Sequence, residues 1–586
     1  MKYDGILRNK EFVLLWNGLL FLNPIKIIFT HDFNSVENCF RQIEKSLSDG
    51  YYIAGYISYE AAAGFEERLP KIKSADIPLL RFGVYNRIYK GEFPPKAPLP
   101  SAGAPFNQRA DKSEKTYLRD IDKIKEHIRK GDTYQVNHTF KYKFDFRGCA
   151  YSLFFKLSKE HPVSYAALIS FDNKKIISIS PELFLERKGS LIRMKPMKGT
   201  MERGKNIYED RAKDRQLKGC AKNRAENLMI VDMIRNDLGR ISKTGSVKTT
   251  KLFEIEKYNT LFQMTSTVES RLKPEVNWYG IFKALFPSAS VTGAPKIRTM
   301  QIINELEKKP RNIYTGAIGY ISPAHKAAFN IAIRTLLIDE HKKQGELGVG
   351  GGVTISSNPA QELSECKLKA QFFSRQYPRF ELIETIAWER NKLFLLNLHM
   401  KRLEESAQYF NFKYSKKLIL ESLKQHSRKF SKNKRYKVRL LLDKEGRVRI
   451  ASSALSARRE NAGKIIFSKI KTKSSDIFLY HKTTRRLLYD SEYKKYSKKG
   501  FTDVVFLNEK NQATEGAISN IIIKKNETYY TPPLNCGLLN GVYRQYIIKS
   551  DKIPIREKAM FRKDIINADK VFICNSVRGM REVCVR

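Results

Sequence analysis

The chain has 586 residues, a formal net charge of +47 at pH 7, and 42% hydrophobic and 11% aromatic residues. A chain of this length exceeds what one hydrophobic core supports, so we expect two or more globular domains. The composition argues against a disordered or membrane-spanning protein, because it contains no long polar tract and no apolar run of spanning length. Basic residues are spread along the whole length without a recognition motif, so the charge is weak support for nucleic-acid binding.

The seven cysteines are scattered without a CxxC pair, which is typical of reduced cytoplasmic thiols and argues against a zinc site. The N-terminus lacks the basic segment, apolar block and cleavage site of a signal peptide. The apolar stretch from Phe12 to Phe29 is interrupted by polar residues and predicts two strands. We therefore expect a cytoplasmic protein without a membrane partner.

In chain order, residues 1 to about 90 predict short strands and one helix, followed by a Pro-rich loop from Gly91 to Pro105. A helix is predicted from about Ser113 to Lys130, with Gly131 ending it. A strand begins in GDTYQVNHTF, and strands and helices then mix without βαβ regularity. This pattern predicts a large α+β domain over residues 1–376 and a second domain over residues 377–586.

The segment SPELFLERKGSLIRMKPMKGT, residues 180–200, carries an acid and an amine sixteen residues apart. Strands are predicted at Lys175–Ser180 and Leu191–Met194, joined by a turn. Such a hairpin can bring Glu182 and Lys198 to the same rim. Most Glu and Lys residues are solvated surface groups, so the pair by itself indicates little.

The segment from Ala221 to Ile241 predicts a helix with a broad apolar face. Glu226 shares this face with Ile230 and Met233, at i+4 and i+7. A carboxylate aimed into an apolar surface needs a cation or hydrogen bonds. A structural salt bridge to an arginine would satisfy it as well as a ligand would.

A further helix is predicted after Asn358, which suits the N-cap, with Pro359 in the first position. Glu362, Glu365 and Lys369 then fall on one face. Acids are ordinary in the first turns of a helix because the macrodipole favours them there. Together with Glu226, however, they make three carboxylates, the ligand type that Mg²⁺ prefers.

The glycine-rich run GVGGGVTISS, residues 348–357, is not a dinucleotide fingerprint, since no βαβ unit surrounds it. Its backbone N–H groups can converge on a carboxylate or a phosphate. Arg334 can add a bidentate contact to a carboxylate. A plain turn and a surface ion pair are the alternative explanations.

Eight motifs occur in the order found in the chorismate-utilising enzymes: SPELF, KPMKGT, NRAENLMIVDMIRNDLGR, SVTGAPK, YTGAIGY, FNIAIRT, GVGGG and QELSECKLKA. The resemblance covers roughly residues 1–375 and implies an α/β sandwich. The family includes anthranilate, isochorismate and salicylate synthases and aminodeoxychorismate synthase component I. Lys198 makes the chain similar to the last of these, because anthranilate synthases have alanine there. Gln263 stands where anthranilate synthases have histidine.

The resemblance implies that Lys198 attacks the ring of chorismate while Glu182, as general acid, assists departure of the C4 hydroxyl. Ammonia then displaces the lysine and gives 4-amino-4-deoxychorismate. Lys198 must be a neutral amine, which burial and a nearby Mg²⁺ would favour by lowering its pKa. By the same resemblance, Mg²⁺ is held by Glu226, Glu362 and Glu365, and the substrate by Tyr314, Arg334, Gly350, Gly352 and Lys369.

Ammonia has to come from elsewhere, because no segment resembles a glutaminase. Cys220, in KGCAK, lacks the glycine-flanked turn of such nucleophiles. The resemblance therefore implies a separate glutamine amidotransferase subunit as partner. Some family members hold tryptophan near the motif at Tyr134–Asn137, and the sequence leaves open whether this chain does.

Five later motifs resemble, in order, the fold-type IV pyridoxal-phosphate enzymes: HMKRLEESA, YHKTTRR, NQATEGAISNIII, TPPLNCGLLNGVYR and ICNSVRG. The match spans about Phe380 to Arg586 and implies an α+β domain that forms homodimers. Lys482 would form the Schiff base, and Glu515 would meet the pyridinium nitrogen. The phosphate would be held by Arg402, Asn575, Ser576 and the backbone N–H of Val542, after Gly541.

The fusion favours aminodeoxychorismate lyase over a transaminase in the second domain, because one domain's product is then the other's substrate. The sequence thus predicts a bifunctional enzyme that makes 4-aminobenzoate for folate. Two alternatives remain open. One is an anthranilate or salicylate synthase fused to an unrelated aminotransferase, and the other is a basic nucleic-acid-binding protein without catalysis.

Overall fold

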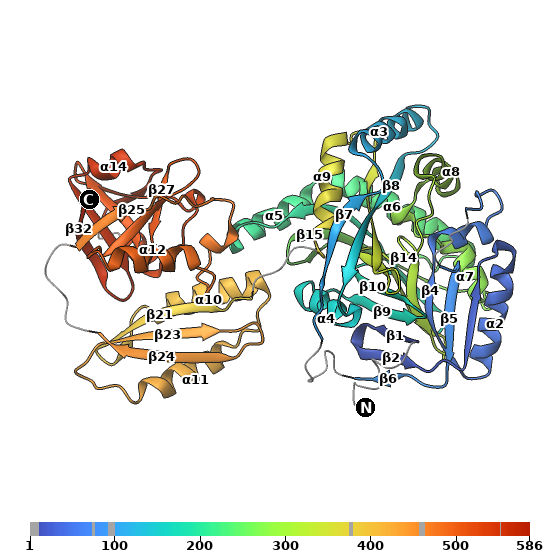
Figure 1. The fold of residues 1–586 in the computed structure, drawn as a ribbon, viewed down its shortest axis with the longest axis horizontal. Coiled ribbons are helices and arrows are strands. Elements are labelled where there is room, and N and C mark those ends of the chain that lie inside the picture. The colour runs from blue at the N-terminus through green and yellow to red at the C-terminus, as the bar shows by residue number, and fades with distance from the viewer. Residues whose placement is uncertain (1–10, 73–76, 92–99, 374–378, 456–462, 551–552) are drawn as a thin grey trace. The chain divides into compact units, whose positions relative to one another are not determined.

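The computed structural model describes residues 11–72, 77–91, 100–373, 379–455, 463–550 and 553–586, which form two compact units (Figure 1). The first unit comprises Met1–Met201 and Arg215–Tyr377, and the second comprises Glu202–Asp214 and Pro378–Arg586. No local pattern indicates that the short segment Glu202–Asp214 belongs with the C-terminal unit.

The first unit contains two ten-stranded sheets. One has the order β16-β8-β20-β19-β10-β9-β1-β2-β6, with β7 beside β8. Its strands are β1 (Phe12–Leu15), β2 (Leu19–Leu22), β6 (Tyr89–Lys90), β7 (Ala104–Ala110), β8 (Gln135–Arg147), β9 (Tyr165–Phe171), β10 (Lys174–Ser180), β16 (Gly293–Ala294), β19 (Thr335–Asp339) and β20 (Gln344–Val353).

The other sheet has the order β13-β15-β12-β11-β18-β17-β4-β5-β3, with β14 beside β15. Its strands are β3 (Lys26–Thr30), β4 (Tyr52–Ile57), β5 (Leu80–Tyr85), β11 (Leu183–Lys188), β12 (Leu191–Lys195), β13 (Met197–Glu202), β14 (Lys248–Lys257), β15 (Leu261–Arg271), β17 (Ala317–Ile321) and β18 (Lys326–Ile331).

Apolar side chains from both sheets form a common core, with Phe21 and Ile169 from the first sheet and Tyr56 and Ile318 from the second. Helices cover the outer faces. The first sheet carries α3 (Glu114–Arg129), α4 (Ala150–Glu160), α8 (Lys296–Glu307) and α9 (Pro359–Ala370). The second carries α2 (Val36–Ser48), α6 (Ala221–Ile241) and α7 (Trp278–Leu285). The predicted α/β sandwich is confirmed.

Side-chain caps mark the starts of two helices, α3 and α9, at the predicted residues. The Ser113 side chain accepts a hydrogen bond from the Thr116 N–H at 3.1 Å and caps α3. Asn358 caps α9 by accepting from the Gln361 N–H at 3.1 Å. The stretch from Phe12 to Phe29, predicted as two strands, contributes to three. Asn17 and Asn23 adopt positive φ there, which asparagine tolerates, and each turns the chain.

The predicted hairpin forms with one different strand. β12 pairs with β11 across the turn at Gly189, whereas the predicted partner segment is β10, which pairs with β9 and β19 in the other sheet. Glu182 therefore lies where the chain passes from one sheet to the other. Lys198 lies on β13 of the second sheet.

The glycine-rich run is mostly strand rather than loop. Residues 348–353 belong to β20, in which Gly350 pairs with Thr139 and Gly352 with Asn137 of β8. An extended strand presents its N–H groups along its edges instead of converging them on one point. Neither the convergence of these N–H groups on one point nor a plain turn describes residues 348–353.

The second unit has a four-stranded sheet of order β22-β21-β23-β24, flanked by α10 (Leu396–Phe410) and α11 (Lys416–Ser427). A second sheet has eight strands in the order β27-β26-β25-β32-β31-β28-β29-β30. The strands are β21 (Leu382–Glu389), β22 (Lys392–Leu393), β23 (Tyr436–Leu442), β24 (Val448–Ala454), β25 (Gly463–Phe467), β26 (Asp503–Leu507), β27 (Ala513–Gly516), β28 (Asn520–Lys525), β29 (Thr528–Thr531), β30 (Ile555–Glu557), β31 (Lys570–Asn575) and β32 (Gly579–Val585).

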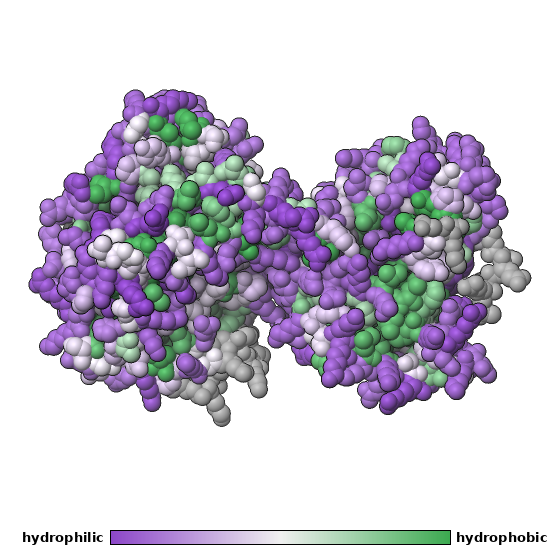
Figure 2. Space-filling view, turned by 180° about the vertical axis from the view of Figure 1, so that it is seen from behind, coloured by the Kyte–Doolittle hydropathy of each residue, from purple (hydrophilic) through white to green (hydrophobic). Residues whose placement is uncertain are grey.

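The remaining helices are α12 (Leu487–Ser497), α13 (Val542–Lys549), α14 (Arg562–Ile566) and α5 (Ile207–Gly219), whose first residues lie in the inserted segment. Within the described ranges, no helix has both the length and the apolar character to cross a membrane. Hydrophilic residues cover most of the face seen in Figure 2 on both units. This surface agrees with basic residues that are spread along the chain.

Candidate functional sites

Glu182 is buried, with 3% of its surface exposed. Its Oε1 accepts hydrogen bonds from Ser290 Oγ at 2.7 Å and from the Met197 N–H at 3.2 Å. Burial raises the pKa of Glu182 to about 7, against the opposing effect of these donors and of Lys198. A protonated carboxyl group is therefore available near neutral pH, as a general acid requires.

Lys198 lies beside Glu182. Burial lowers the pKa of Lys198, and the nearby carboxylate of Glu226 opposes that shift. The backbone of Lys198 is fixed, because its carbonyl accepts a hydrogen bond from Asn227 Nδ2 at 3.1 Å. Ser266 Oγ in turn donates to Asn227 Oδ1 at 2.6 Å. The structure thus brings Glu182 and Lys198 into one region, and hydrogen bonds fix the backbone of the strand that carries Lys198.

The three predicted carboxylates lie within electrostatic range of this amine, since Glu226, Glu365 and Glu362 all raise the pKa of Lys198 against the effect of burial. Burial and the charge of Glu365 raise the pKa of Glu362. Ser357 Oγ donates a hydrogen bond to Glu362 at 2.7 Å. Glu362 and Glu365 are therefore close enough for their charges to repel each other.

Two of these carboxylates also lie near lysines. Lys369 Nζ forms an ion pair with Glu365 at 2.7 Å, and Lys222 Nζ lies 4.0 Å from Glu226. Among the described residues, no group of three or more His, Cys, Asp or Glu side chains is already arranged to hold a metal ion. The donor chemistry suits a hard cation, but the side chains would have to move to share one.

The glycines of β20 provide space for neighbouring groups. A Cβ on Gly348 would lie 2.1 Å from Tyr314 Cγ, and a Cβ on Gly352 would lie 2.1 Å from Lys198 Nζ. A Cβ on Gly350 would lie 2.4 Å from a backbone oxygen of β8. Tyr314 and Lys198 can therefore approach β20 only because it lacks side chains at these positions.

Lys369 and Arg334 also belong to this region. Lys369 Nζ donates to the Gly350 carbonyl at 3.0 Å. Burial and Glu256 raise the pKa of Tyr258, Arg334 opposes them and Glu182 adds a smaller increase, so Arg334 and Glu182 both lie within electrostatic range of Tyr258. Gln263 is near as well, since its Oε1 accepts from Thr200 Oγ1, two residues after Lys198, at 3.2 Å.

In the second unit, Lys482 is half-buried and Glu515 is buried, and the charge of each acts on the pKa of the other. Burial, together with Arg486 and Arg402, lowers the pKa of Lys482 to about 7. Burial raises the pKa of Glu515 to about 8. Tyr489 Oη donates to Glu515 at 3.3 Å. The amine and the carboxyl can both exchange protons near neutral pH.

Arg402 is held by a residue that the sequence analysis did not single out. Its Nε and Nη2 donate to the two oxygens of Glu384 at 2.9 and 2.7 Å. His399 Nδ1 also lies 2.6 Å from Glu384. A single acid inside the apolar strand LIETIA was the available signal, because such a carboxylate needs a buried cation.

The residues predicted to hold the phosphate differ in whether their polar groups are available to an anion. Arg402 Nη1 donates to the Asn540 carbonyl at 3.4 Å, next to the start of α13 at Val542. Asn575 Oδ1 accepts from two backbone N–H groups, at 3.1 and 2.9 Å. Ser576 Oγ donates to the Thr385 carbonyl at 3.2 Å. Arg402 and the helix start can face an anion, whereas the Asn575 and Ser576 side chains are bonded to backbone.

Comparison with known proteins gives two family matches. The chorismate binding enzyme family matches residues 26–375, and amino-transferase class IV matches residues 381–585. The aminodeoxychorismate synthase of Streptomyces griseus is 41% identical over 278 residues, which are 47% of this chain and 38% of that protein. Component 1 of the aminodeoxychorismate synthase of Bacillus subtilis is 38% identical over 270 residues, 46% of this chain and 56% of that one.

A crystal structure of anthranilate synthase component I from Streptococcus pneumoniae superposes with a TM-score of 0.54 at 24% identity. It covers 62% of this chain and 92% of that one, and shares the fold of the first unit. The chain spans about half or less of the length of these curated relatives.

Proposed function

The chain belongs to the chorismate binding enzyme family, and from this premise we propose that its first domain, residues 1–376, converts chorismate and ammonia to 4-amino-4-deoxychorismate. The second domain, residues 377–586, eliminates pyruvate from that product and leaves 4-aminobenzoate. The observation that carries the proposal is the pairing of the half-buried Lys198, whose pKa is lowered, with the buried Glu182, whose pKa is raised.

In the first reaction, the neutral amine of Lys198 forms a bond to the ring while the C4 hydroxyl leaves. Glu182 gives its proton to that oxygen, so that water departs instead of hydroxide. Ammonia then attacks C4 and releases the lysine. Tyr314, Arg334 and Lys369 orient the substrate, and Gly350 and Gly352 leave room for its approach.

Mg²⁺ suits the carboxylate region on chemical grounds. Burial and the charge of Glu365 raise the pKa of Glu362, and a dication would relieve that repulsion. Glu226, Glu362 and Glu365 would hold the ion after Lys369 releases Glu365. Mg²⁺ would supply positive charge for the carboxylates of chorismate.

Pyridoxal phosphate suits the second site. It would supply an electron sink when bound. Lys482, with a pKa of about 7, would hold and move the proton at the reacting carbon, and Glu515 would serve the ring nitrogen. Arg402 and the N–H groups at Val542 would hold the phosphate, and Asn575 and Ser576 would fix the neighbouring backbone.

The proposed partners follow from this chemistry. A separate glutamine amidotransferase subunit delivers ammonia, in agreement with the name "component 1" of the Bacillus subtilis relative. We further propose a cytoplasmic location and a homodimer formed through the second domain.

Anthranilate or salicylate synthesis is the second candidate function, since a solved relative of the same fold is an anthranilate synthase. Lys198 and Gln263 argue against it.

The test is chromatography of the products after the purified protein is mixed with chorismate, ammonium, Mg²⁺ and pyridoxal phosphate. We expect 4-aminobenzoate and an equal amount of pyruvate. Lys198→Ala should stop chorismate consumption, and Lys482→Ala should accumulate aminodeoxychorismate. Anthranilate or salicylate as product would overturn the first assignment, and aminodeoxychorismate alone from the wild type would overturn the second.

A further inference from the structure

Arg311, in the loop after α8, is only 2% exposed although it carries a permanent charge. Its Nε and Nη2 donate to the two oxygens of Glu307 at 2.8 and 2.7 Å. Nη2 also donates to the Asn137 carbonyl at 2.6 Å, while Nη1 donates to the Val291 carbonyl at 3.0 Å and to Thr315 Oγ1 at 3.3 Å. A guanidinium has five N–H groups in a planar fork, so each of them is matched here by an acceptor from the protein.

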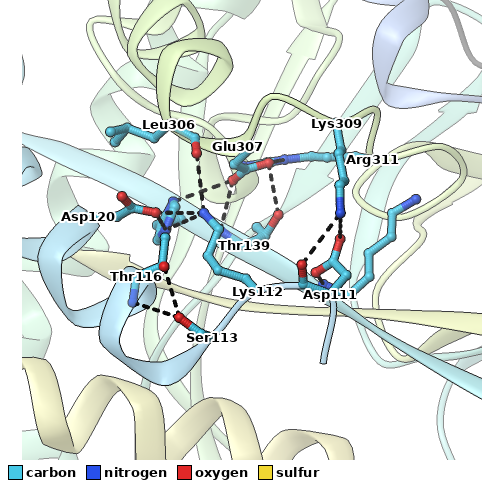
Figure 3. A network of polar contacts seen from close by, with 12 residues as sticks. Asp111, Lys112, Ser113, Thr116, Asp120, Thr139, Leu306, Glu307, Lys309 and Arg311 are labelled. Carbon is cyan, nitrogen blue, oxygen red and sulfur yellow. Dashed lines mark hydrogen bonds and ion pairs between the residues drawn. The ribbon is translucent and has the colours of Figure 1, made fainter. Parts of the chain in front are cut away.

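The pair of Arg311 and Glu307 also holds the adjoining strand β8, as Figure 3 shows. The N–H and Oγ1 of Thr139 donate to the two oxygens of Glu307 at 2.8 and 3.0 Å. The side chains of Arg311 and Glu307 are 2% and 6% exposed, so the ion pair is buried. Taking two charges out of water is costly unless hydrogen bonds satisfy their remaining polar atoms, as they do here. The guanidinium is thus fixed to both α8 and β8.

One acceptor of this guanidinium connects it to the proposed general acid. Val291 is the last residue of the short 3-10 turn η4 (Ala289–Val291), and its carbonyl accepts from Arg311 and, at 3.1 Å, from a side-chain amide of β8. Ser290, in the same turn, donates through its Oγ to Glu182 Oε1 at 2.7 Å. The turn is therefore anchored on one side by Arg311 and presents the Ser290 hydroxyl to Glu182 on the other.

Another acceptor connects the guanidinium to the backbone of Tyr314. Thr315 has a φ of +62°, which a β-branched residue rarely adopts. Its Oγ1 accepts from Arg311 and donates to the Tyr314 carbonyl at 2.6 Å. The carboxylate of Glu60 accepts from the backbone N–H groups of Arg311 and Asn312, at 2.5 and 3.1 Å. Strained backbone of this kind persists where its surroundings fix it, and it is typical of functional sites.

We propose that Arg311 is a positioning residue of the first site. It holds the turn that directs Ser290 at Glu182, and it holds the backbone that carries Tyr314. Its own donors are all engaged with the protein, so it acts through these residues and not by binding substrate. Arginine suits this role because its planar fork reaches several separate acceptors, whereas the three donors of lysine diverge from one point. The substrate used in the tests, chorismate, rests on the proposed function.

Arg311→Lys tests the proposal, because it keeps the charge and removes the fork. We expect kcat for chorismate to fall about 10- to 100-fold, since the acid is no longer held in place. The bond from Ser290 lowers the pKa of Glu182, so a weakened bond should move the alkaline limb of kcat/KM up by about half a pH unit. Lys198, the charged group that also acts on the pKa of Glu182, is unchanged in this variant.

Arg81→Lys is the matched control, because it makes the same change in a half-buried ion pair of the first unit. Arg81 pairs with Glu11 at 2.6 Å and lies over the rings of Phe29 and Phe171, none of which belongs to a proposed site. Both variants should lower the melting temperature, whereas Arg81→Lys should change kcat less than about twofold and leave the alkaline limb in place. An Arg311→Lys protein with wild-type kcat and an unmoved limb would overturn the proposal.

A double variant tests the route through Ser290. If Arg311 acts on Glu182 through Ser290, the alkaline limb of Ser290→Ala with Arg311→Lys should coincide with that of Ser290→Ala alone. Shifts of the limb that add in the double variant would exclude this route.

Thr315→Val tests the connection to Tyr314 on its own, including the case in which Arg311→Lys does not fold. Valine keeps the branched shape and removes the Oγ1 that joins Arg311 to Tyr314. The KM for chorismate should rise about 3- to 10-fold while the alkaline limb stays in place, because Glu182 is untouched. An unchanged KM would overturn this part of the proposal.

An NMR titration of the Glu182 carboxyl, assigned with Glu182→Gln, separates this inference from the proposed function. The pKa of Glu182 should be higher in Arg311→Lys than in the wild type and in Arg81→Lys, whatever the substrate is. Equal titration in the three proteins, with chorismate consumed, would overturn the role of Arg311 and leave the function intact. A wild type that does not consume chorismate, with the titration shifted only in Arg311→Lys, would overturn the function and leave Arg311 as the residue that positions Glu182.

Discussion

At the scale of single residues, burial shifts the pKa of one amine and one carboxyl group in each of the two units. Burial lowers the pKa of the amines of Lys198 and Lys482 and raises the pKa of the carboxyls of Glu182 and Glu515. In each case the neutral form is favoured, because a low-dielectric surrounding penalises charge. Pairs of this kind, with converging pKa values, are typical of acid–base sites.

The hydrogen bond from Ser290 to Glu182 leads to a prediction about pH. This bond lowers the pKa of Glu182, so Ser290→Ala should raise that pKa further above about 7. Since Glu182 acts in its protonated form, the alkaline limb of kcat/KM for chorismate should move to higher pH. The profile can be measured from about pH 6 to about pH 9, with the exposed Ser48→Ala as control. An unchanged limb would show that Glu182 does not set it.

Glu384 offers a prediction about stability. Against the effect of burial, Arg402 and His399 lower the pKa of Glu384 to about 2, below the ordinary value of 4.5. A depressed folded-state pKa adds stability that is present above about pH 4.5 and is lost as the pH falls toward about 2. Glu384→Gln should therefore destabilise the protein by about 3 kcal/mol at neutral pH, because Arg402 stays buried without its partner.

Denaturant titration of wild type and Glu384→Gln at several pH values measures this effect. The difference between the two proteins should shrink as the pH falls below about 4.5. Glu421→Gln, at an exposed position of α11, should change stability by less than about 0.5 kcal/mol. A constant difference at all pH values would contradict the ionised Glu384–Arg402 pair.

At the scale of elements, β20 is unusual because alternate positions on one face are glycine. Gly348, Gly350 and Gly352 have this spacing, and strand side chains alternate between faces with a period of two. Here the missing side chains leave room for Tyr314 and Lys198, so the strand forms one wall of the site.

Gly352→Ala tests the need for that space. The added methyl group would lie 2.1 Å from Lys198 Nζ, so the amine must move. We expect chorismate consumption to fall at least about tenfold, while cleavage of supplied aminodeoxychorismate is unchanged. Gly239→Ala in α6, where a Cβ meets nothing within 4 Å, should leave both activities intact and raise stability by about 0.5 to 1 kcal/mol. Equal behaviour of the two variants would argue against a spatial role for Gly352.

At the scale of the whole molecule, the segment Glu202–Asp214 belongs to the second unit although it follows β13, which carries Lys198. Arg203 Nη2 forms a buried ion pair with Asp210 at 2.6 Å and also donates to the Tyr409 carbonyl at 2.9 Å. Tyr409 Oη donates back to the Gly204 carbonyl at 2.6 Å. The segment is therefore part of the packing of the second unit.

The segment Glu202–Asp214 also contacts His481, the residue before Lys482 in the sequence. His481 Nε2 lies 3.1 Å from the Lys205 carbonyl and donates to it, and its Nδ1 lies 3.0 Å from Ser406 Oγ. Burial lowers the pKa of His481 to about 3, so the ring is neutral. The residue before the proposed catalytic lysine is thus fixed by a segment from the other half of the sequence.

Arg203→Ala tests the importance of this insertion. It leaves the Asp210 carboxylate buried without its cation, which should destabilise the second unit by about 3 to 5 kcal/mol. Hydrogen exchange in α10 and cleavage of supplied aminodeoxychorismate measure the effect. Arg211→Ala, an exposed position of the same segment, is the control and should change neither. Unchanged exchange in α10 after Arg203→Ala would mean that the segment contributes little.

The sequence by itself determined the family, the order of its motifs and the helix ends, since caps and apolar periodicity depend on residues a few positions apart. The tertiary structure decided which strands share a sheet, and so put Glu182 between the two sheets and the guanidinium of Arg311 against the carbonyl of Val291. It also decided the pairing of Glu384 with Arg402 and the place of Glu202–Asp214. These contacts join residues far apart in the chain, and long-range pairing and burial, not local preference, select them.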